Sequence, residues 1–304
     1  IETGRAFKVE YVIGCDTEKG QVWDNNFGSN YIARHDGFKV LTLNLHCYQE
    51  AEQDKKFNEI VRAISEIDID IVCFQEVGEE WNKGKGNWRT NAAKLIRNRL
   101  RERGCYYHLY KDWSHIGFDR YHEGSAILSK HRFLKRKSSY VSLGKDINNI
   151  HSRKVVMAQV NVPYIGLVNV FCVHLSWWTD GFRQQFENLR RWADEEESEQ
   201  VVATLLCGDF NTKPGTQGYM LIVDSREYED QFLRTTSPAI FTEIFRKTLP
   251  DREAYLAGDN RIDYIYAKKN GKLKPRNSRI LFSGYDYRRV SDHMGHLTEF
   301  EPEE

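Results

Sequence analysis

Asp209, whose carboxylate can take a proton, and Asn211, whose amide can hold a ligand by hydrogen bonds, stand one residue apart after an apolar run. Apolar and small residues at 201–206 predict a buried strand that ends at Gly208. Residues 212–215 then break the regular structure. In extended backbone, residues two apart point the same way, so both side chains should face the space beyond the strand. The carboxylate can accept hydrogen bonds and a proton, and the amide can both donate and accept. An isolated Asp-x-Asn is most often a polar turn, so its interpretation depends on the rest of the chain.

Several other apolar runs also end in acids, amides or histidines. Together with Asp209 and Asn211, the set comprises Asn44, Glu76, His174, Asp263, Asp292 and His293. Each residue alone is most often structural. Because it is costly to end buried strands repeatedly in unpaired polar groups, the set indicates a common site. If the strands align, these eight groups meet at one rim.

The hydrophobic pattern predicts the elements that would position this set. Strands are expected at residues 38–44, 69–77, 105–110, 124–129, 154–160, 167–174, 201–209 and 261–266. Helices are expected at residues 50–67, 90–103 and 180–198. Many strands, few helices and no repeats favour an α+β or α/β layered sandwich.

Composition narrows the class of protein. The 304 residues suffice for one large domain, or for one domain with a small appendage. Lys+Arg and Asp+Glu both number 44, so the balance of charge does not favour a nucleic-acid partner, which needs a basic surface. The six cysteines lack C-x-x-C spacing, so we expect no zinc site of the usual kind. We interpret Cys73, Cys172 and Cys207 as buried, reduced thiols, which favours a cytoplasmic location.

The sequence gives two further expectations about location. No apolar run approaches the roughly 20 residues of a membrane span, so we expect no membrane partner. The chain starts at Ile1 and not at a methionine, so whether a segment or signal precedes it stays an open question. The pattern favours no particular oligomeric state.

The ordered motifs resemble one superfamily. They are Leu43-Asn44, Phe74-Gln75-Glu76-Val77, Gly124-Ser125-Ala126-Ile127-Leu128-Ser129, Val173-His174-Leu175, Gly208-Asp209-Phe210-Asn211, Arg261-Ile262-Asp263-Tyr264 and Ser291-Asp292-His293. Over residues 38–300 they are similar to the motifs of the endonuclease/exonuclease/phosphatase, or DNase I-like, superfamily. The resemblance implies a four-layer α/β/β/α sandwich of two mostly antiparallel, mixed sheets flanked by helices. It also implies a Mg²⁺-dependent site at one end, with Mn²⁺ as a substitute.

The resemblance also implies roles for the set. Glu76 would ligate the metal with Asn44 beside it, and Asp292 would complete the metal or water network. Asp209 would orient or deprotonate the attacking water, and Asn211 would hold that water or a phosphoryl oxygen. Asp263 would fix the tautomer of His293, which with His174 would stabilise the phosphoryl group. Such donors suit phosphoryl transfer, in which negative charge spreads over several oxygens. Arg153 is either a further phosphate contact or a surface arginine.

Residues 1–37 differ in character from the catalytic domain expected at 38–304. Residues 7–13 alternate and predict a strand. Residues 22–31 resemble the C-terminal part of starch-binding carbohydrate modules, in which a W-D-N-N-x-G-x-N-Y run helps a small β-sandwich to hold glucan chains. A surface turn with packed aromatic side chains is the plainer alternative. The resemblance covers about thirty residues, so we expect the end of such a module and not a complete one.

The substrate is the open question. His174-x-Ser176-Trp177-Trp178 and Arg120-Tyr121-x-Glu123-Gly124 resemble the superfamily's bacterial maltose 6′-phosphate phosphatases, which implies a phosphorylated sugar as substrate. One of Trp177 and Trp178 should pack on the following helix, and the other should offer its indole face to a sugar ring. Arg120 and Glu123 are candidates for hydroxyl contacts.

Two other functions stay open. A phosphodiesterase of the same superfamily, sphingomyelinase-like or a nuclease, would use the same chemistry. A sphingomyelinase-like enzyme would need an exposed apolar hairpin, for which residues 113–118 are the nearest candidate. A nuclease would need basic residues on the loops of the site, for which Lys83, Lys85 and Arg89 are the nearest cluster. A sugar-binding or scaffold protein could have kept the fold without the activity, although the intact set of acids and histidines argues against that.

Overall fold

The computed structural model describes residues 15–16, 21–22, 37–82, 85–235 and 260–303. The chain divides into two compact units, residues 1–36 and 37–304. In the first unit, β1 (Cys15–Asp16) pairs antiparallel with β2 (Gln21–Val22). The predicted strand at 7–13, and the module-like run at 22–31 apart from Val22, lie outside the described residues.

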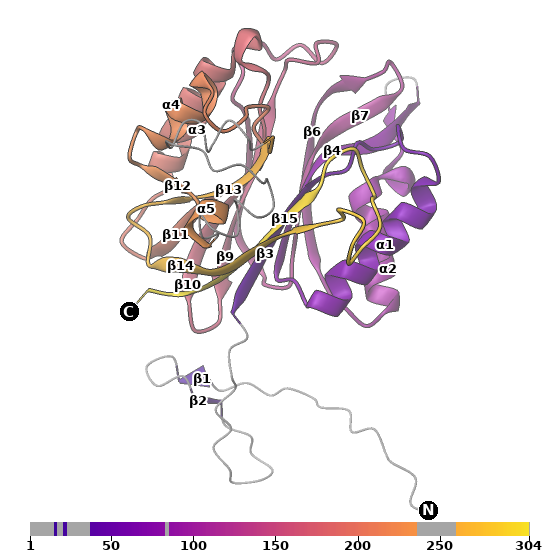
Figure 1. The fold of residues 1–304 in the computed structure, drawn as a ribbon. Helices are drawn as coiled ribbons and strands as arrows, with labels where there is room; N and C mark the ends of the chain where they lie inside the picture. Colours follow the sequence, from indigo (N-terminus) through magenta and orange to yellow (C-terminus); the bar gives the residue numbers. More distant parts are fainter. Residues whose placement is uncertain (1–14, 17–20, 23–36, 83–84, 236–259, 304) are drawn as a thin grey trace, which may run out of the picture. The chain divides into compact units, whose positions relative to one another are not determined.

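A seven-stranded sheet and a six-stranded sheet form the centre of the second unit (Figure 1). The first has the order β14-β15-β3-β4-β7-β6, and the second has the order β12-β13-β11-β10-β9-β8. The first sheet contains β3 (Phe38–Asn44), β4 (Ile71–Asn82), β6 (His108–Gly117), β7 (Tyr121–Ser129), β14 (Leu273–Leu281) and β15 (Gly295–Pro302), and the short β5 (Lys85–Gly86) pairs with β4. The second contains β8 (Phe133–Tyr140), β9 (Lys154–Val162), β10 (Gly166–His174), β11 (Val201–Asp209), β12 (Tyr228–Asp230) and β13 (Asp263–Lys268).

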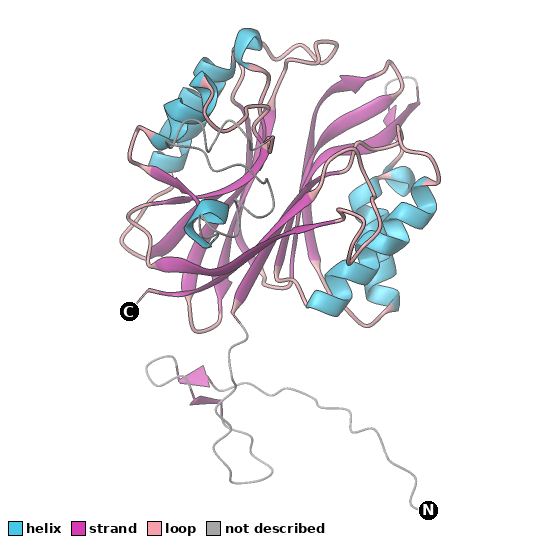
Figure 2. Cartoon of the chain, in the orientation of Figure 1, coloured by secondary structure: helices cyan, strands magenta, loops and turns pink. Residues whose placement is uncertain are grey.

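Helices cover the outer faces of both sheets, which completes four layers (Figure 2). On the first sheet lie α1 (Gln53–Ile67) and α2 (Ala92–Glu102); on the second lie α3 (Phe182–Glu195) and α4 (Gln217–Val223). The remaining helical elements of the described residues are η1 (Trp88–Thr90), η2 (Trp178–Asp180) and the one-turn α5 (Gln231–Thr235). The predicted α+β sandwich is therefore confirmed. Among the described residues, no helix is long and apolar enough to cross a membrane.

Apolar side chains fill the space between the two sheets. Val40 and Ile71 from the first sheet are in one cluster with Cys172 and Cys207 from the second. Because both sheets are covered on both faces, their central strands are almost continuously apolar. Cys73, Cys172 and Cys207 are free and 0% exposed, so the prediction that they are buried thiols is confirmed.

The structure corrects several predicted boundaries. The strand pattern predicted neither β8 nor β14, because edge strands with many exposed side chains lack a clear apolar alternation. The short β12 and the central β15 were also not among the predicted strands. The strand predicted at 105–110 is β6, which starts at His108 and continues to Gly117. The strand predicted to end at Val77 continues to Asn82. The helix predicted from residue 50 begins at Gln53, because Glu52 has left-handed backbone (φ 53°).

Gly208 is required by the close approach of β10 to β11. A Cβ atom at this position would lie 1.9 Å from the carbonyl oxygen of Val173. We expect Gly208→Ala to lower the free energy of unfolding by at least about 2 kcal/mol, measured by chemical denaturation, because the clash is with backbone and cannot be relieved by a rotamer change. Gly144→Ala is the matched control. Its Cβ would meet nothing closer than 4.0 Å, so a change within about 0.5 kcal/mol is expected. Equal effects of the two substitutions would contradict the argument.

Candidate active site

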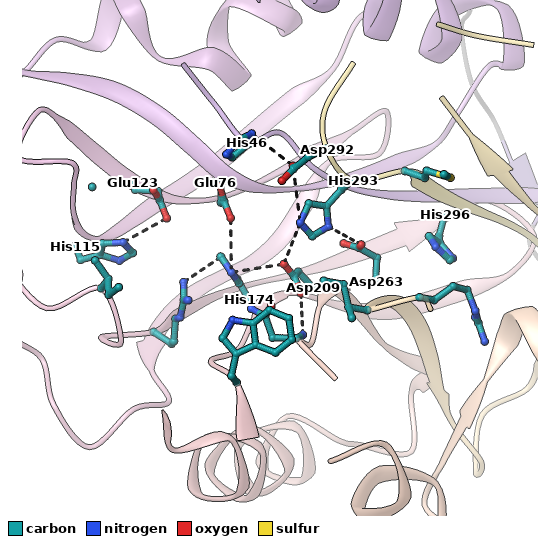
Figure 3. Close-up of a pocket in the computed structure, with 18 of the residues that line it drawn as sticks. His46, Glu76, His115, Glu123, His174, Asp209, Asp263, Asp292, His293 and His296 are labelled. Carbon is teal, nitrogen blue, oxygen red and sulfur yellow. Dashed lines mark hydrogen bonds and ion pairs between the residues drawn. The ribbon is translucent and has the colours of Figure 1, made fainter. Parts of the chain in front are cut away.

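Strand register brings the predicted polar groups to one rim (Figure 3). β10 and β11 are parallel, and His174 pairs with Asp209 at their carboxyl ends. The antiparallel β13 then places Asp263 opposite Asp209. In the other sheet, β3 and β4 are parallel, and Asn44 pairs with Gln75 beside Glu76. Groups that are far apart in sequence therefore meet between the open ends of the two sheets.

Glu76 reaches the rim from the middle of a strand and not from its end. The register of β4 shifts between Phe74 and Val77, and Glu76 has left-handed backbone (φ 48°). Such a bulge redirects one side chain while the strand continues. The sequence identified Glu76, but the bulge that turns it towards the site is a tertiary feature.

A cavity of about 1030 Å³ opens over this rim. Its walls include seven of the eight predicted polar groups, namely Glu76, His174, Asp209, Asn211, Asp263, Asp292 and His293. The eighth, Asn44, lies beneath them and is fully buried. Asn211 does not reach the cavity by strand alternation, because its own backbone is left-handed (φ 48°). Its side-chain nitrogen donates to the carbonyl oxygen of Leu175 (2.8 Å), which fixes the orientation of the amide.

The Asp209 carboxylate is buried and held on both oxygens. The backbone N–H of Asn211 donates to Oδ1 (2.8 Å), and Nδ2 of Asn44 donates to Oδ2 (3.1 Å). Burial, and then the charge of Asp263, raise the pKa of Asp209 to about 7. A carboxylate with a pKa near neutrality can accept a proton from a water molecule in the physiological range.

His174 is held as a neutral imidazole. Nη1 of Arg153 lies 3.2 Å from its Nδ1. A guanidinium can only donate, so Nδ1 accepts and the ring proton is on Nε2. Burial, and then the charge of Arg153, hold the pKa of His174 well below its usual value. Nε2 lies 3.7 Å from Oδ2 of Asp209 and 3.9 Å from Oε1 of Glu76, so its N–H points into the carboxylate cluster.

His293 is in the opposite charge state. Its Nδ1 lies 2.7 Å from Oδ2 of Asp263, the pairing that the motif resemblance implies. Burial opposes the charged ring, but the hydrogen bond to Asp263 and the nearby carboxylates outweigh it and raise the pKa of His293 to about 10. Nε2 lies 3.8 Å from Oδ2 of Asp209. One neutral and one charged histidine therefore donate towards the same space.

The carboxylates fit a divalent cation. One carboxylate oxygen each from Glu76 and Asp209 and one ring nitrogen of His174 lie within 4.8 Å of one another. Because Nε2 of His174 carries the ring proton, the two carboxylates would be the ligands and the histidine would donate beside them. Burial, and then the charge of Glu123, raise the pKa of Glu76 to about 7, so the site concentrates negative charge that a cation would neutralise. Asn44 donates through Nδ2 to Glu76 (2.9 Å), and its Oδ1 accepts from the backbone N–H of His46. In this orientation Asn44 positions Glu76 from beside it, and its predicted contact with the metal stays a prediction.

Asp292, for which a place in the metal or water network is predicted, lies beside His46 and His293. Its Oδ1 lies 3.5 Å from Nδ1 of His46 and 4.0 Å from Nε2 of His293. It clusters with His46 and Glu50, a set that has no member in common with Glu76, His174 and Asp209.

The structure separates the residues predicted to bind substrate into two groups. Arg153, Trp177 and Glu123 line the cavity, and Trp177 is 50% exposed. Trp178 lies outside the cavity and packs against Phe182 of α3 (ring centroids 5.9 Å apart), as expected for one of the two tryptophans. Arg120 also lies outside it, exposed on the turn between β6 and β7, with its guanidinium over the ring of Tyr121.

Three cavity histidines were not predicted as site residues: His46, His115 and His296. His115 is 2% exposed, and its Nε2 lies 3.3 Å from Oε1 of Glu123. The two are register partners on β6 and β7 beyond a bulge, so only the pairing of these strands reveals the contact. His46 had a sequence signal, because it follows Asn44 at the end of an apolar strand.

The four-layer fold and the acid–histidine cluster at one end define a phosphoesterase architecture. The sequence model of the endonuclease/exonuclease/phosphatase family matches residues 41–293, and the chain belongs to this family. The family consists of metal-dependent phosphoesterases, phosphatases and nucleases among them. No curated protein matches the sequence.

Solved structures are similar in fold. A family member from Leptotrichia buccalis C-1013-b is 22% identical, with a TM-score of 0.69 over 87% of this chain and 99% of that chain. A mannosyl-6-phosphatase from Bacteroides thetaiotaomicron VPI-5482 is 14% identical, with a TM-score of 0.58 over 87% and 99%. D. rerio TDP2, complexed with a single-strand DNA product, is 16% identical, with a TM-score of 0.58 over 88% and 99%. At these identities the likeness concerns the fold.

Metal affinity should depend on pH. Because the pKa values of Glu76 and Asp209 are raised to about 7, both carboxyls hold protons below that pH, and a cation must displace them. We expect the Mg²⁺ affinity measured by calorimetry to fall as the pH drops below 7, by up to about tenfold per pH unit for each displaced proton. Glu76→Gln should weaken binding and reduce this slope. A pH-independent affinity between about pH 8 and 6 would contradict the assignment.

Proposed function

We propose that the protein is a Mg²⁺-dependent phosphomonoesterase that hydrolyses a phosphorylated sugar by attack of water. Asp209 accepts the proton of the water, and Asn211 helps to hold that water. His174 and His293 donate from Nε2 to the phosphoryl oxygens, and Arg153 adds positive charge beside them. The divalent cation, Mg²⁺ or Mn²⁺ in its place, supplies further stabilisation of negative charge on the phosphoryl group.

The side chains in the cavity wall beside the acid cluster are the main support for a sugar phosphate as substrate. Here a half-exposed indole, Trp177, lies in the wall together with the buried His115 and the partly buried Glu123 that it contacts. An aromatic face suits the apolar face of a sugar ring, and a carboxylate with unused lone pairs suits its hydroxyl groups. This combination supports a neutral, hydroxyl-rich leaving group.

Maltose 6′-phosphate is the specific substrate that we propose, with maltose and phosphate as products. The motif resemblance favours it, and a mannosyl-6-phosphatase with the same fold shows that the architecture can serve a sugar phosphate. Such a substrate places the protein in the cytoplasm, without a nucleic-acid or membrane partner.

A phosphodiesterase activity is the second candidate, because the cavity extends past the catalytic cluster on its other side. Phe232, Ile262 and Ile280 line this extension, and Arg261 beside them is held by Asp230 (2.9 Å). A phosphate monoester has one substituent and needs one such extension, whereas a diester would use both.

A phosphate-release screen tests the chemistry and the substrate. With Mg²⁺, we expect release from maltose 6′-phosphate to exceed release from nucleotides and phospholipid headgroups. Asp209→Asn should lower kcat by about 10²–10⁴-fold, because it removes the general base while keeping the shape of the side chain. Undiminished turnover by that variant would refute the role of Asp209. Faster turnover of a nucleotide diester or of sphingomyelin would favour the diesterase. Sugar binding without any hydrolysis would favour a scaffold.

The tryptophan pair gives a matched test of the sugar contact. Trp177→Ala should weaken binding of sugar phosphates by about 0.5–1.5 kcal/mol, seen as a higher KM, with stability unchanged within about 0.5 kcal/mol. Trp178→Ala should instead lower the free energy of unfolding by about 1–3 kcal/mol and leave KM unchanged, because it packs on Phe182. A loss of stability in Trp177→Ala together with a higher KM in Trp178→Ala would contradict the assignment of Trp177 to the sugar contact.

A further inference from the structure

The cavity extends beyond the side chains that the proposed reaction uses, towards the tip of the β6–β7 hairpin. From His115 and Glu123 (Figure 3), its wall continues along the hairpin to residues 116–119. None of these four residues has a role in the phosphoryl chemistry proposed above. Two residues of β-strand span roughly 7 Å, so the step from His115 to Gly117 suits one further sugar ring.

Phe118 at the hairpin tip has a backbone conformation that its side chain disfavours. The backbone N–H of Arg120 donates to the carbonyl oxygen of Gly117 (3.0 Å), which closes a β-turn. The two central residues, Phe118 and Asp119, both have left-handed backbone (φ 53° and 52°), as in type I′ turns. Such turns favour Asn, Asp and Gly, so Asp119 suits its position and Phe118 does not. Phe118 is also 66% exposed, so core packing does not explain its aromatic ring.

The loop between β8 and β9 supplies more of the wall at this end of the cavity. The backbone N–H of Ile116 donates to the carbonyl oxygen of Ile147 (2.6 Å), which ties the loop to the hairpin. Oδ1 of Asp146 accepts from the backbone N–H of Asn148 (2.9 Å) and from its Nδ2 (3.3 Å), which orients the amide. Asn148 and the exposed Ile150 both line the cavity. Hairpin and loop therefore present a surface that is ordered before any ligand binds.

The chemistry of this surface matches a neutral sugar ring. Phe118, Asp119 and Asn148 line the same end of the cavity. An exposed aromatic face packs against the apolar face of a sugar, and a carboxylate and an amide can bind its hydroxyl groups. A lipid acyl chain would leave Asp119 and Asn148 without hydrogen bonds. A second phosphate would be repelled by the Asp119 carboxylate.

We infer that Phe118, Asp119 and Asn148 form a subsite for a second sugar ring of the leaving group, next to the ring that contacts Trp177. This inference rests on the proposed hydrolysis of a phosphorylated sugar, and it adds the residues that select a disaccharide over a monosaccharide. Phe118 stacks on the second ring, and Asp119 and Asn148 bind its hydroxyl groups. The unfavourable backbone of Phe118 then serves substrate binding and not the stability of the fold.

Phosphate release from maltose 6′-phosphate and from glucose 6-phosphate, measured with Mg²⁺, tests the subsite. We expect the wild-type kcat/KM to be at least about tenfold higher for the disaccharide. Phe118→Asn should lower this ratio by about 3–10-fold, because it removes the aromatic contact. The same substitution should raise the midpoint of thermal unfolding, since Asn suits a type I′ turn. Tyr285→Ala is the matched control, because Tyr285 is an exposed aromatic residue that does not line the cavity, and the ratio should not change.

Saturation-transfer NMR with maltose gives a readout that does not depend on catalysis. Protons of both sugar rings should receive saturation from the wild-type protein, and the signal of one ring should fall in Phe118→Asn. Equal kcat/KM for the two substrates, saturation of one ring only, or an unchanged ratio in folded Phe118→Asn would each overturn the subsite and leave the phosphatase function intact. Release of phosphate from neither substrate would instead overturn the proposed function, and the NMR signals would still decide the subsite.

Discussion

The burial of the Asp209 carboxylate between the open ends of two sheets is the constraint on which the rest of the site depends. A buried charge must be paired and hydrogen-bonded to be tolerated. The backbone of Asn211 and the side chain of Asn44 supply the hydrogen bonds, one from each sheet. The same contacts therefore link the two sheets and fix the position of the carboxylate that we propose as the general base. Its pKa is near neutrality.

Two histidines on either side of Asp209 differ in charge because their partners differ. Arg153 donates to Nδ1 of His174 and disfavours a second proton on that ring, whereas Asp263 accepts from Nδ1 of His293 and favours one. Both arrangements direct an Nε2–H at the same space. The site thus places a carboxylate beside two N–H donors of different charge, an arrangement that suits the water attack that we propose.

The fold determines the chemistry more tightly than it determines the substrate. The groups at Asp209 are fixed by strand register in the middle of the sheets, where neither sheet can shift without losing its core. The walls that would meet the leaving group come from turns and strand ends, such as Trp177 and the tip of the β6–β7 hairpin. Solved structures that include a sugar phosphatase and a DNA-processing enzyme have this fold, consistent with function residing in the walls.

The sequence by itself determined most of the central strands, though not β15, together with the layered class and the polar set, because apolar runs that end in acids and histidines are local patterns. It could not find β8 and β14, whose exposed edge positions carry no such pattern. It also could not show that Glu76 turns towards the rim at a bulge, that His115 meets Glu123 across two strands, or that Asp292 faces His46. Those contacts depend on register and on the packing of one sheet against the other. Only the tertiary structure fixes these, because they join residues that are distant in the chain.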